Sequence, residues 1–599
     1  MTTRSFSWII LGIAAAILFL AAEPAVRSQS SGGAALTGLV SSQEEGPMEG
    51  VLVGAKREGS TMTVTVVSDD KGRYRFPQDR LQPGRYSLRI RAAGYDLASP
   101  ATVEIMSGKP ADLDLKLRKT ANLASQLSNA EWILSANGTN QMKIALYNCV
   151  MCHSLERIVR SQHDADEWMQ TIARMNYYVG STPLKPQRRP PPPPEEVARQ
   201  AQARKEREKR FVGAGGMLPQ GRGQGGGDGM DGENGGNDRG GPGRRQFAEF
   251  LASINLSKGS TWSYDLKTLP RPRGRATHVI YTTYELPRKE TMVHDCNFGP
   301  DGMVWYTDFG SQFFGKLDPK TGKTTEFPVP IIKPGFPEGL MDIRFDKQGN
   351  IWMGMMAQAG IAKFNMQTQK LETYPVPPEA NTNGAQVAMV MPYSSDVDGK
   401  VWMNNVGPHA IQRLDIKTGK MDTVYIYKDY LKDLVEHGTY GINSDAQNNL
   451  YVNDIAANMI VRVDAKTLES KFYQTPTPNS GPRRGRMDSQ YHLWVALSRA
   501  DKFALLDPQS GEIQEIPSPT PFSQIYDIMP DKYGDVWAGG MTSDFVYRLE
   551  PKSRQITQYL LPKIDTNIRR VDVDSTAKPP VFWVGDDHSP TIYRVEPLD

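Results

Sequence analysis

The spacing of hydrophobic positions changes twice along the chain and separates three segments of different type. In residues 33–119, apolar and polar residues alternate in short runs, as at 61–67 and 86–91, and turn-forming residues separate the runs. Alternation with a period of two between turns predicts short antiparallel strands. The pattern therefore predicts an N-terminal β-sandwich over residues 33–119.

Residues 130–258 carry apolar positions at helical spacing, most clearly at 140–147, 165–178 and 246–254. This pattern predicts a small all-α domain. A proline- and glycine-rich insertion at 182–245 interrupts it. That composition buries too little apolar surface to offset chain entropy, so we expect a disordered insertion with a helical stretch near 195–210.

The last segment, residues 262–599, repeats at roughly 40–50 residues. Each unit places one aromatic residue in a strand that follows a turn such as PDG or KQG. The aromatic residues are Trp305, Trp352, Trp402, Tyr451, Trp494, Trp537 and Trp583. Seven units of short strands predict a C-terminal seven-bladed β-propeller, with these aromatics packed between blades. Residues 262–284 are expected to supply the outer strand that closes the last blade.

The chain is thus expected to be a multidomain, mainly β protein. At 599 residues it is too long for a single hydrophobic core. Its formal charge of +3 is close to balance, so no nucleic-acid partner is expected.

Cys149, Cys152 and His153 form a CxxCH motif, the attachment pattern of c-type haem. The two thiols add to the haem vinyl groups, and the histidine ligates the iron. A zinc site would need two further ligands, and the only other cysteine is the distant Cys296. The motif therefore predicts one covalent haem c.

The texts CVMCHSLERI, EWMQTIARM and FAEFLASINL resemble a small class I c-type cytochrome with a long inserted loop. A thioether is the usual sixth iron ligand in that family, and Met175 is the first candidate. The alternatives that remain open are Met169, Met217, Met230, His163 and an unfilled sixth position.

Residues 1–30 are expected to be a secretory signal peptide, and an uncleaved N-terminal anchor is the alternative. Their apolar run, 8–22, follows Arg4 and is too short to span a bilayer comfortably. The expected location is the periplasm or cell surface of a bacterium, with no membrane span after cleavage. Export agrees with the haem prediction, since covalent attachment takes place outside the bacterial cytoplasm.

Two further resemblances cover the β segments. LTGLV, GVLVGA, SDDKGRYRFP and LQPGRYSLRIRAAGY resemble the carboxypeptidase regulatory-like domain, which implies a binding or spacer module. The repeat YTDFGSQFFGKLDPKTGKTTEFPVP resembles the virginiamycin B lyase (streptogramin lyase) family. That family opens ester-closed cyclic peptides by elimination, with a histidine acid/base and acids that hold magnesium.

Two repeated positions are expected near one mouth of the propeller channel. Eleven residues before the aromatic lie His294, Met341, Met391, Tyr440, Arg483, Tyr526 and Asp572. Three residues after it lie Asp308, Met355, Asn405, Asp454, Leu497, Gly540 and Asp586. His409 and His588 follow their strands and are expected nearby.

His294 and Asp308 match the lyase resemblance as a candidate catalytic pair, and Asp454 and Asp586 are candidate ligands for magnesium in the channel. The match departs from the family, whose pair lies in a late blade and whose acid is expected to be Glu. Three hypotheses follow. The first is a haem protein that exchanges electrons with a redox partner protein or a small-molecule substrate. The others are a magnesium-dependent lyase and a non-catalytic binding or sensor protein.

Overall fold

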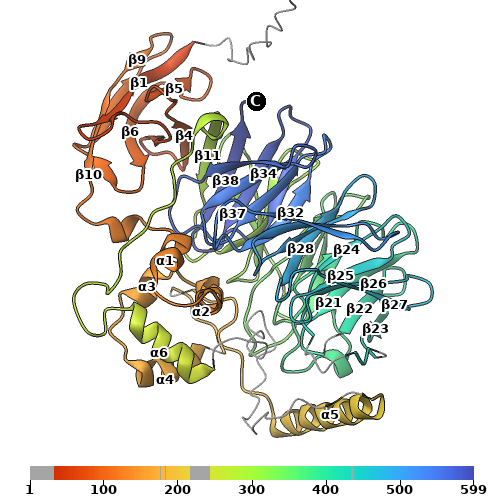
Figure 1. The fold of residues 1–599 in the computed structure, drawn as a ribbon. Helices are drawn as coiled ribbons and strands as arrows, with labels where there is room; N and C mark the ends of the chain where they lie inside the picture. The colour runs from red at the N-terminus through yellow and green to blue at the C-terminus, as the bar shows by residue number, and fades with distance from the viewer. Residues whose placement is uncertain are drawn as a thin grey trace, which may run out of the picture. The chain divides into compact units, whose positions relative to one another are not determined.

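The computed structural model describes residues 33–175, 177–182, 184–215, 217, 243–408, 410–428, 430–432 and 437–599. The expected signal peptide, Met230 and His409 lie outside these residues, as does most of the glycine-rich part of the insertion. Figure 1 shows the strands of the N-terminal and C-terminal segments and the helices between them in the sequence.

The N-terminal segment is a two-layer β structure, as the alternation predicts. One sheet contains β1, β2, β5, β7, β9 and β10, and the other contains β3, β4, β6 and β8. Leu36, Val53, Tyr74, Phe76 and Leu88 fill the space between them, and each is buried. The strands are β1 (Ala34–Ser42), β2 (Gly46–Pro47), β3 (Leu52–Arg57), β4 (Met62–Val67), β5 (Arg73–Pro77), β6 (Gly84–Arg91), β7 (Tyr95–Leu97), β8 (Ala101–Ile105), β9 (Ala111–Asp112) and β10 (Leu115–Lys119).

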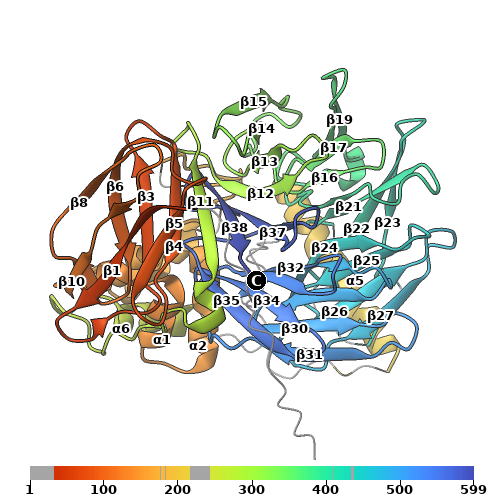
Figure 2. The same cartoon turned by 90° about the horizontal axis from the view of Figure 1, so that it is seen from above.

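The C-terminal segment folds as the predicted propeller, and six of its sheets each use four consecutive strands. Figure 2 shows the sheets following one another round a ring in chain order. The six are β12 (Val293–Phe298), β13 (Val304–Asp308), β14 (Phe313–Leu317), β15 (Thr324–Pro328); β16 (Ile343–Phe345), β17 (Asn350–Gly354), β18 (Gly360–Asn365), β19 (Leu371–Pro375); β20 (Val390–Met391), β21 (Lys400–Asn405), β22 (Ala410–Asp415), β23 (Met421–Val424); β24 (Thr439–Ser444), β25 (Leu450–Asp454), β26 (Met459–Val463), β27 (Ser470–Gln474); β28 (Pro482–Met487), β29 (Leu493–Leu497), β30 (Lys502–Leu506), β31 (Ile513–Pro517); β32 (Ile525–Pro530), β33 (Val536–Gly540), β34 (Phe545–Glu550), β35 (Gln555–Leu560).

The seventh blade closes the ring as expected. It combines β36 (Val571–Asp574), β37 (Val581–Asp586) and β38 (Thr591–Pro597) with β11 (Val279–Glu285) from the start of the segment. Seven antiparallel residue pairs join β11 to β38. The strand that precedes the first blade in sequence therefore holds the two ends of the propeller together.

The repeated aromatic residues pack between blades, and in the second and sixth blades an aspartate of the preceding turn also binds the tryptophan. Trp352 and Trp537 are fully buried, and their indole N–H groups donate to Asp346 and Asp531 at 2.8 and 2.9 Å. These carboxylates also accept backbone N–H groups of their own turns. One aspartate thus shapes the hairpin and satisfies the buried indole, which would otherwise lose its hydrogen bond to water.

The sandwich and the propeller share one sheet, which the sequence pattern does not predict. β11 pairs with β38 on one edge and with β4 on the other, so eight strands run without a break in the order β36-β37-β38-β11-β4-β3-β6-β8. Figure 2 shows β11 between β38 and the sandwich strands. The buried carboxylate of Asp544 also pairs with Arg91 at 2.6 Å. The N-terminal module is therefore continuous with the seventh blade.

Residues between these parts form helices, most of them short. They are η1 (Leu123–Gln126), α1 (Asn129–Ser135), α2 (Asn140–Ala145), η2 (Leu146–Met151), α3 (Glu156–Val159), α4 (Ala165–Met175), α5 (Pro194–Gly213) and α6 (Arg244–Ile254). Trp132, Tyr147, Val150, Trp168 and Leu251 share one hydrophobic core that continues into the propeller. Two single-turn helices, η3 (Gly274–Thr277) and η4 (Pro378–Ala380), lie within the C-terminal segment.

The insertion contains the helix expected near residues 195–210. Residues 194–213 form α5, which begins with a proline in its first turn. The chain before α5 is tied to the propeller by Lys185, whose Nζ donates to Glu338 at 2.8 Å. Glu196 accepts the backbone N–H of Asn383 at 2.9 Å. These polar contacts order a segment whose composition alone favours disorder.

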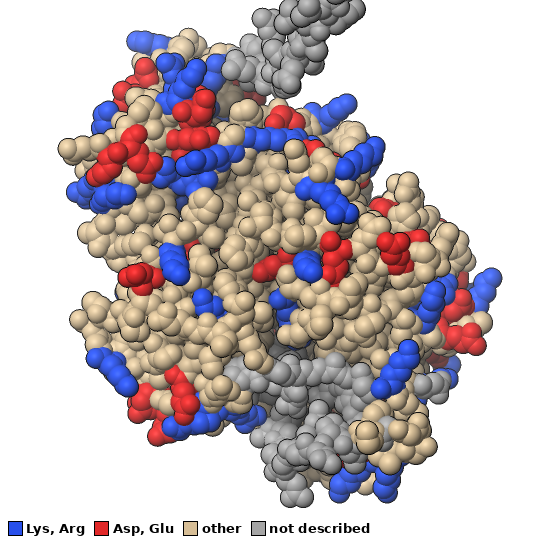
Figure 3. Space-filling model, viewed as in Figure 1, with Lys and Arg blue, Asp and Glu red and all other residues tan. Residues whose placement is uncertain are grey.

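Charged side chains of both signs are interspersed on the face shown in Figure 3. Within the part of the chain that the structure describes, no helix is long and apolar enough to cross a membrane.

Candidate functional site

The CxxCH segment lies in a tight turn at the end of a short helix. The threonine Thr139 begins α2 by accepting the backbone N–H of Met142, and α2 leads directly into the 3-10 helix η2. Cys149 lies within η2, and Cys152 is the residue that follows it. A 3-10 helix has three residues per turn, which places positions i and i+3 on the same side. The two cysteines therefore lie about one 3-10 turn apart along the chain, and neither forms a disulfide.

A backbone hydrogen bond holds the imidazole of His153 in one tautomer. Its Nδ1 donates to the carbonyl of Ser154 at 3.0 Å, which leaves Nε2 with the lone pair. Burial lowers the pKa of His153, so its neutral form predominates at neutral pH. Burial also raises the pKa of Cys149 to about 12, which keeps it from acting as a reactive thiolate.

The candidate sixth ligands lie in different surroundings. Met175, at the end of α4, is 41 % exposed, and Met169 packs against the helical core. Met217 is exposed. The ring of His163 packs edge-on against Trp168, with 5.1 Å between centroids. The structure thus describes four of the five residue candidates and singles out none of them.

The backbone of the motif docks on the propeller through its carbonyl groups. The carbonyl of Val150 accepts Nδ2 of Asn567 at 2.7 Å, and that of Met151 accepts Nη2 of Arg569 at 2.7 Å. His588 lies beside Val150, with its Nε2 at 2.9 Å from the same carbonyl. Blade seven therefore supplies the surface on which the CxxCH segment rests.

Three tiers of side chains line the channel, and strand register defines them. The third tier is the residue paired with the repeated aromatic: Asn297, Arg344, Met391, Asn443, Arg486, Met529 and Asp572. The second tier is the residue two positions before the third-tier residue in each blade: Asp295, Asp342, Met389, Gly441, Arg484, Asp527 and Arg570. The first tier is the residue immediately before the second-tier residue in each blade: His294, Met341, Ala388, Tyr440, Arg483, Tyr526 and Arg569.

Contacts between non-adjacent blades confirm that these side chains meet across the channel. Arg484 of the fifth blade donates to Asp295 of the first at 2.9 Å. Arg570 of the seventh blade donates to Asp342 of the second at 2.7 Å. The hydroxyl groups of Tyr440 and Tyr526, from the fourth and sixth blades, are hydrogen-bonded.

Two members of the expected channel series belong to a different tier. Met391 and Asp572 pair directly with Trp402 and Trp583, eleven residues later, whereas in the other blades the pair is eight residues apart. The longer hairpins, visible in the sequence as PYSSDVDGK and STAKPP, shift the register by three. Ala388 and Arg569 take the first-tier places instead.

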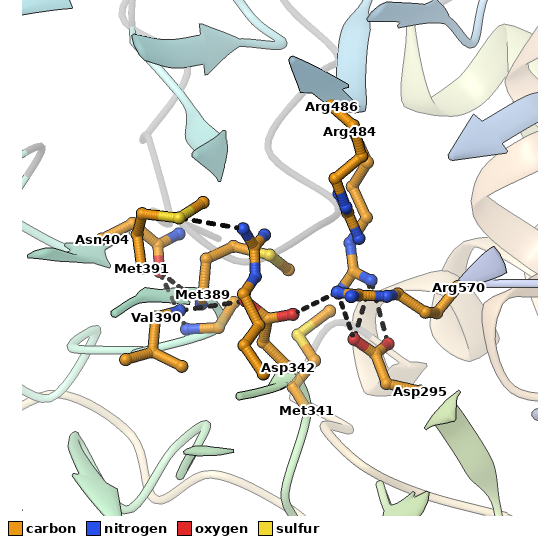
Figure 4. Close-up of polar contacts among 12 residues, drawn as sticks. Asp295, Met341, Asp342, Met389, Val390, Met391, Asn404, Arg484, Arg486 and Arg570 are labelled. Atoms are coloured by element: carbon orange, nitrogen blue, oxygen red, sulfur yellow. Dashed lines mark hydrogen bonds and ion pairs between the residues drawn. The ribbon is translucent and has the colours of Figure 1, made fainter. Parts of the chain in front are cut away.

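The second tier is a buried network of charges. Figure 4 shows Asp295 and Asp342 on either side of Arg570, with Arg484 above Asp295. Burial opposes ionisation of Asp295, but Arg484 and His294 outweigh it and hold its pKa well below the usual range. Arg344 donates to Asp342 at 2.7 Å and to the sulfur of Met391 at 3.3 Å.

The structure places His294 and Asp308 in separate interactions. His294 Nδ1 donates to Asp295 at 2.5 Å, and its buried Nε2 has no hydrogen-bond partner among the described residues. Burial lowers the pKa of His294 to about 4, although Asp295 opposes this. Asp308 accepts Arg288 at 2.8 Å and the backbone N–H of Gly310 at 2.9 Å. Burial raises the pKa of Asp308 to about 6.

Asp454 and Asp586 organise loops in their own blades. Asp454 accepts the backbone N–H of Gly438 at 2.9 Å and Nδ1 of His437 at 2.6 Å. Asp586 accepts the backbone N–H groups of Asn567 and His588, both at 3.0 Å. Across the described ranges, no group of three or more His, Cys, Asp or Glu side chains could hold a metal ion.

Comparison with known proteins covers the two β segments. Residues 35–118 match the carboxypeptidase regulatory-like domain family. No curated protein matches the chain. Among solved structures, virginiamycin B lyase from Staphylococcus aureus is similar at 18 % identity and TM-score 0.44, over 53 % of this chain and 99 % of that one. A streptogramin B lyase is similar at 19 % identity and TM-score 0.45, over 54 % and 99 %. Residues 35–118 therefore form a carboxypeptidase regulatory-like domain.

Proposed function

We propose that the chain is an exported c-type haem protein, located in the periplasm or at the cell surface, that exchanges electrons with a redox partner protein or a small-molecule substrate. The propeller carries the haem-binding segment on its channel mouth and binds that substrate or partner. The observation that supports this most directly is the CxxCH motif itself, presented in a turn and docked on blade seven.

The residues present fit a covalent haem. Cys149 and Cys152 are the attachment positions, and neither is committed to a disulfide. His153 holds its Nδ1 proton on the Ser154 carbonyl and keeps Nε2 for iron, the arrangement that fixes a ligating imidazole. Met175 is our first candidate for the sixth ligand. The haem, when bound, supplies a one-electron redox couple.

The chain's own residues position this segment. Arg569 and Asn567 hold the carbonyls of Met151 and Val150, and Tyr147 donates to Asp501 of the fifth blade at 3.4 Å. Arg569 also lies over the ring of Tyr526, 5.4 Å from its centroid. A ligand bound at the first tier would thus lie close to the haem-binding backbone without a flexible linker between them.

Spectroscopy of the exported protein tests the proposal. The full chain, produced in a host with haem-attachment machinery, is expected to show the reduced-minus-oxidised α-band of a c-type haem. Cys149→Ala with Cys152→Ala is expected to abolish covalent attachment, and His153→Ala to change the spectrum. Cys296→Ala is the matched control, because that thiol is buried in the first blade and is expected to leave the haem unchanged. A haem-free wild-type protein from this host would overturn the proposal.

A second candidate function places acid/base chemistry at His294, as in a magnesium-dependent lyase. The supporting observation is the buried imidazole that Asp295 orients at 2.5 Å while Nε2 has no partner among the described residues. This arrangement is typical of an oriented general base. The assay is ring opening of a cyclic ester peptide. A reaction that requires magnesium and is lost in His294→Ala would support the lyase function. Activity retained in His294→Ala would reject that assignment.

A further inference from the structure

One edge of Arg484 in the second tier has no acceptor. The side chain is 1 % exposed, and its Nη1 donates to both oxygens of Asp295 at 2.9 and 3.0 Å. Nε and Nη2 are buried and have no hydrogen-bond partner among the described residues. Nε of Arg570, on the other side of Asp295, is also buried and has no hydrogen-bond partner among the described residues. Buried donors of charged groups are normally hydrogen-bonded, so these atoms require an explanation.

The unfilled edge has the shape that binds carboxylates. Nε and Nη2 of a guanidinium point in parallel and can donate to two oxygens of one carboxylate. Asp295 fixes the opposite end of the group. The rings of Tyr440 and Tyr526 lie 5.8 and 5.6 Å from its central carbon. Arg484 is therefore held rigidly with its bidentate edge open.

The charge balance of the network favours an anion over a neutral molecule. Four arginines, Arg344, Arg484, Arg486 and Arg570, meet three second-tier aspartates, Asp295, Asp342 and Asp527. The remaining aspartate, Asp572, accepts the backbone N–H of Phe298 at 2.7 Å. Burial raises the pKa of Asp572, which favours its neutral form.

Burial, and after it the charge of Arg570, acts on the ionisation of Arg486. Burial and the nearby Arg570 lower the pKa of Arg486 to about 9. Arg486 pairs with Asp527 only at 3.4 Å. A bound monoanion would neutralise one excess positive charge and reduce the repulsion between these arginines.

The third-tier end of the channel offers a route for such a ligand. Exposure rises toward it, from 1 % at Arg484 to 13 % at Arg486. The hairpins at this end carry the exposed tyrosines Tyr393, Tyr491 and Tyr533. Lysines lie over two of these rings, with Lys347 5.7 Å from the centroid of Tyr393 and Lys532 5.0 Å from that of Tyr533. Exposed aromatic residues therefore border this end of the channel, and Lys347 is itself paired with Asp396.

We infer that the propeller channel binds a carboxylate on the Nε–Nη2 edge of Arg484, entering from the end opposite the CxxCH segment. The inference goes beyond the proposed redox function and does not depend on it. Its ligand class is a small organic monocarboxylate, or a larger molecule that inserts a carboxylate between Arg484 and Arg570.

Isothermal titration of the full chain with formate and with acetate tests the inference, and sulfate serves as the competing tetrahedral anion. Saturable binding of the carboxylates is expected, with affinity at least tenfold weaker in Arg484→Gln. Arg486→Gln, nearer the solvent, is the second variant should Arg484→Gln fail to fold, and it is expected to weaken binding several-fold. Arg462→Gln, in the third strand of the fourth blade and outside the three tiers, is the matched control and should bind as the wild type does.

Circular dichroism confirms that each variant is folded before titration. Absence of saturable binding by both carboxylates would overturn the inference. Unchanged carboxylate affinity in folded Arg484→Gln or Arg486→Gln would also overturn the inference. Tighter binding of sulfate than of either carboxylate would overturn it as well. These measurements need no haem, so their failure is distinct from failure of the redox proposal.

Discussion

Asn567→Ala should weaken the attachment of the CxxCH segment to the propeller. Burial and Arg569 lower the pKa of His588 to about 3, so its ring is neutral at physiological pH. Its Nδ1 lies 3.0 Å from the carbonyl of Asp565 and must carry the proton to donate there. Nε2 is then an acceptor, and it accepts Nδ2 of Asn567 at 3.1 Å. Asn567 is consequently the donor that satisfies the buried carbonyl of Val150.

The magnitude follows from the hydrogen bonds that the substitution removes. Alanine cannot donate to Val150 or His588, and it cannot accept from Nε of Arg569. Each neutral hydrogen bond contributes about 1 kcal/mol net, and a buried group left unsatisfied costs about 1–3 kcal/mol. His588 can recover part of this loss by moving its proton to Nε2, 2.9 Å from the Val150 carbonyl. We expect a net loss of about 2–3 kcal/mol.

Hydrogen exchange of the amides in η2 and α3 is the appropriate assay, because it reports local opening without global unfolding. Opening of these helices should become easier in Asn567→Ala, while exchange in β17 of the second blade should not change. The proton shift predicts coupling: His588→Ala should cost more in the Asn567→Ala background than in the wild type. An opening free energy within about 0.5 kcal/mol of the wild-type value would refute the reasoning.

Two further predictions concern buried carboxylates. Burial raises the pKa of Asp501 to about 6, so the folded state binds a proton more tightly than the unfolded state. Its contribution to the unfolding free energy should therefore rise by about 1 kcal/mol as the pH falls from 7 to 5. Urea titrations should show this rise in the wild type and not in Asp501→Asn. Parallel pH profiles of the two proteins would contradict the prediction. Arg91→Met should leave Asp544 buried without its cation and cost about 3–5 kcal/mol, read as faster exchange in β4 and β11. Unchanged exchange there would show that the shared sheet alone holds the two parts together.

Much of the fold follows from local patterns. The period-two alternation predicts the sandwich, and the repeated aromatic after an aspartate turn predicts seven blades. The closing role of β11 also follows from the segment that precedes the first repeat. These features depend on residues close in sequence, so the sequence is sufficient for them.

The channel site could be predicted only in part. Counting back from the aromatic found His294, Met341, Tyr440, Arg483 and Tyr526, because five blades share one hairpin length. It missed Arg569 and the whole second tier. The longer hairpins of blades three and seven were a visible signal for the shift, but the pairings between tiers, such as Arg484 with Asp295, join distant parts of the chain.

The sequence by itself determined the β-sandwich, the seven blades and the presence of a CxxCH motif. Hydrophobic periodicity and turn residues act over a few positions, and these features need nothing more. Only the tertiary structure decided that β4 extends blade seven, that Val150 and Met151 rest on Asn567 and Arg569, and that one edge of Arg484 stays open. Those facts depend on strand register and ring closure, which bring together side chains hundreds of residues apart.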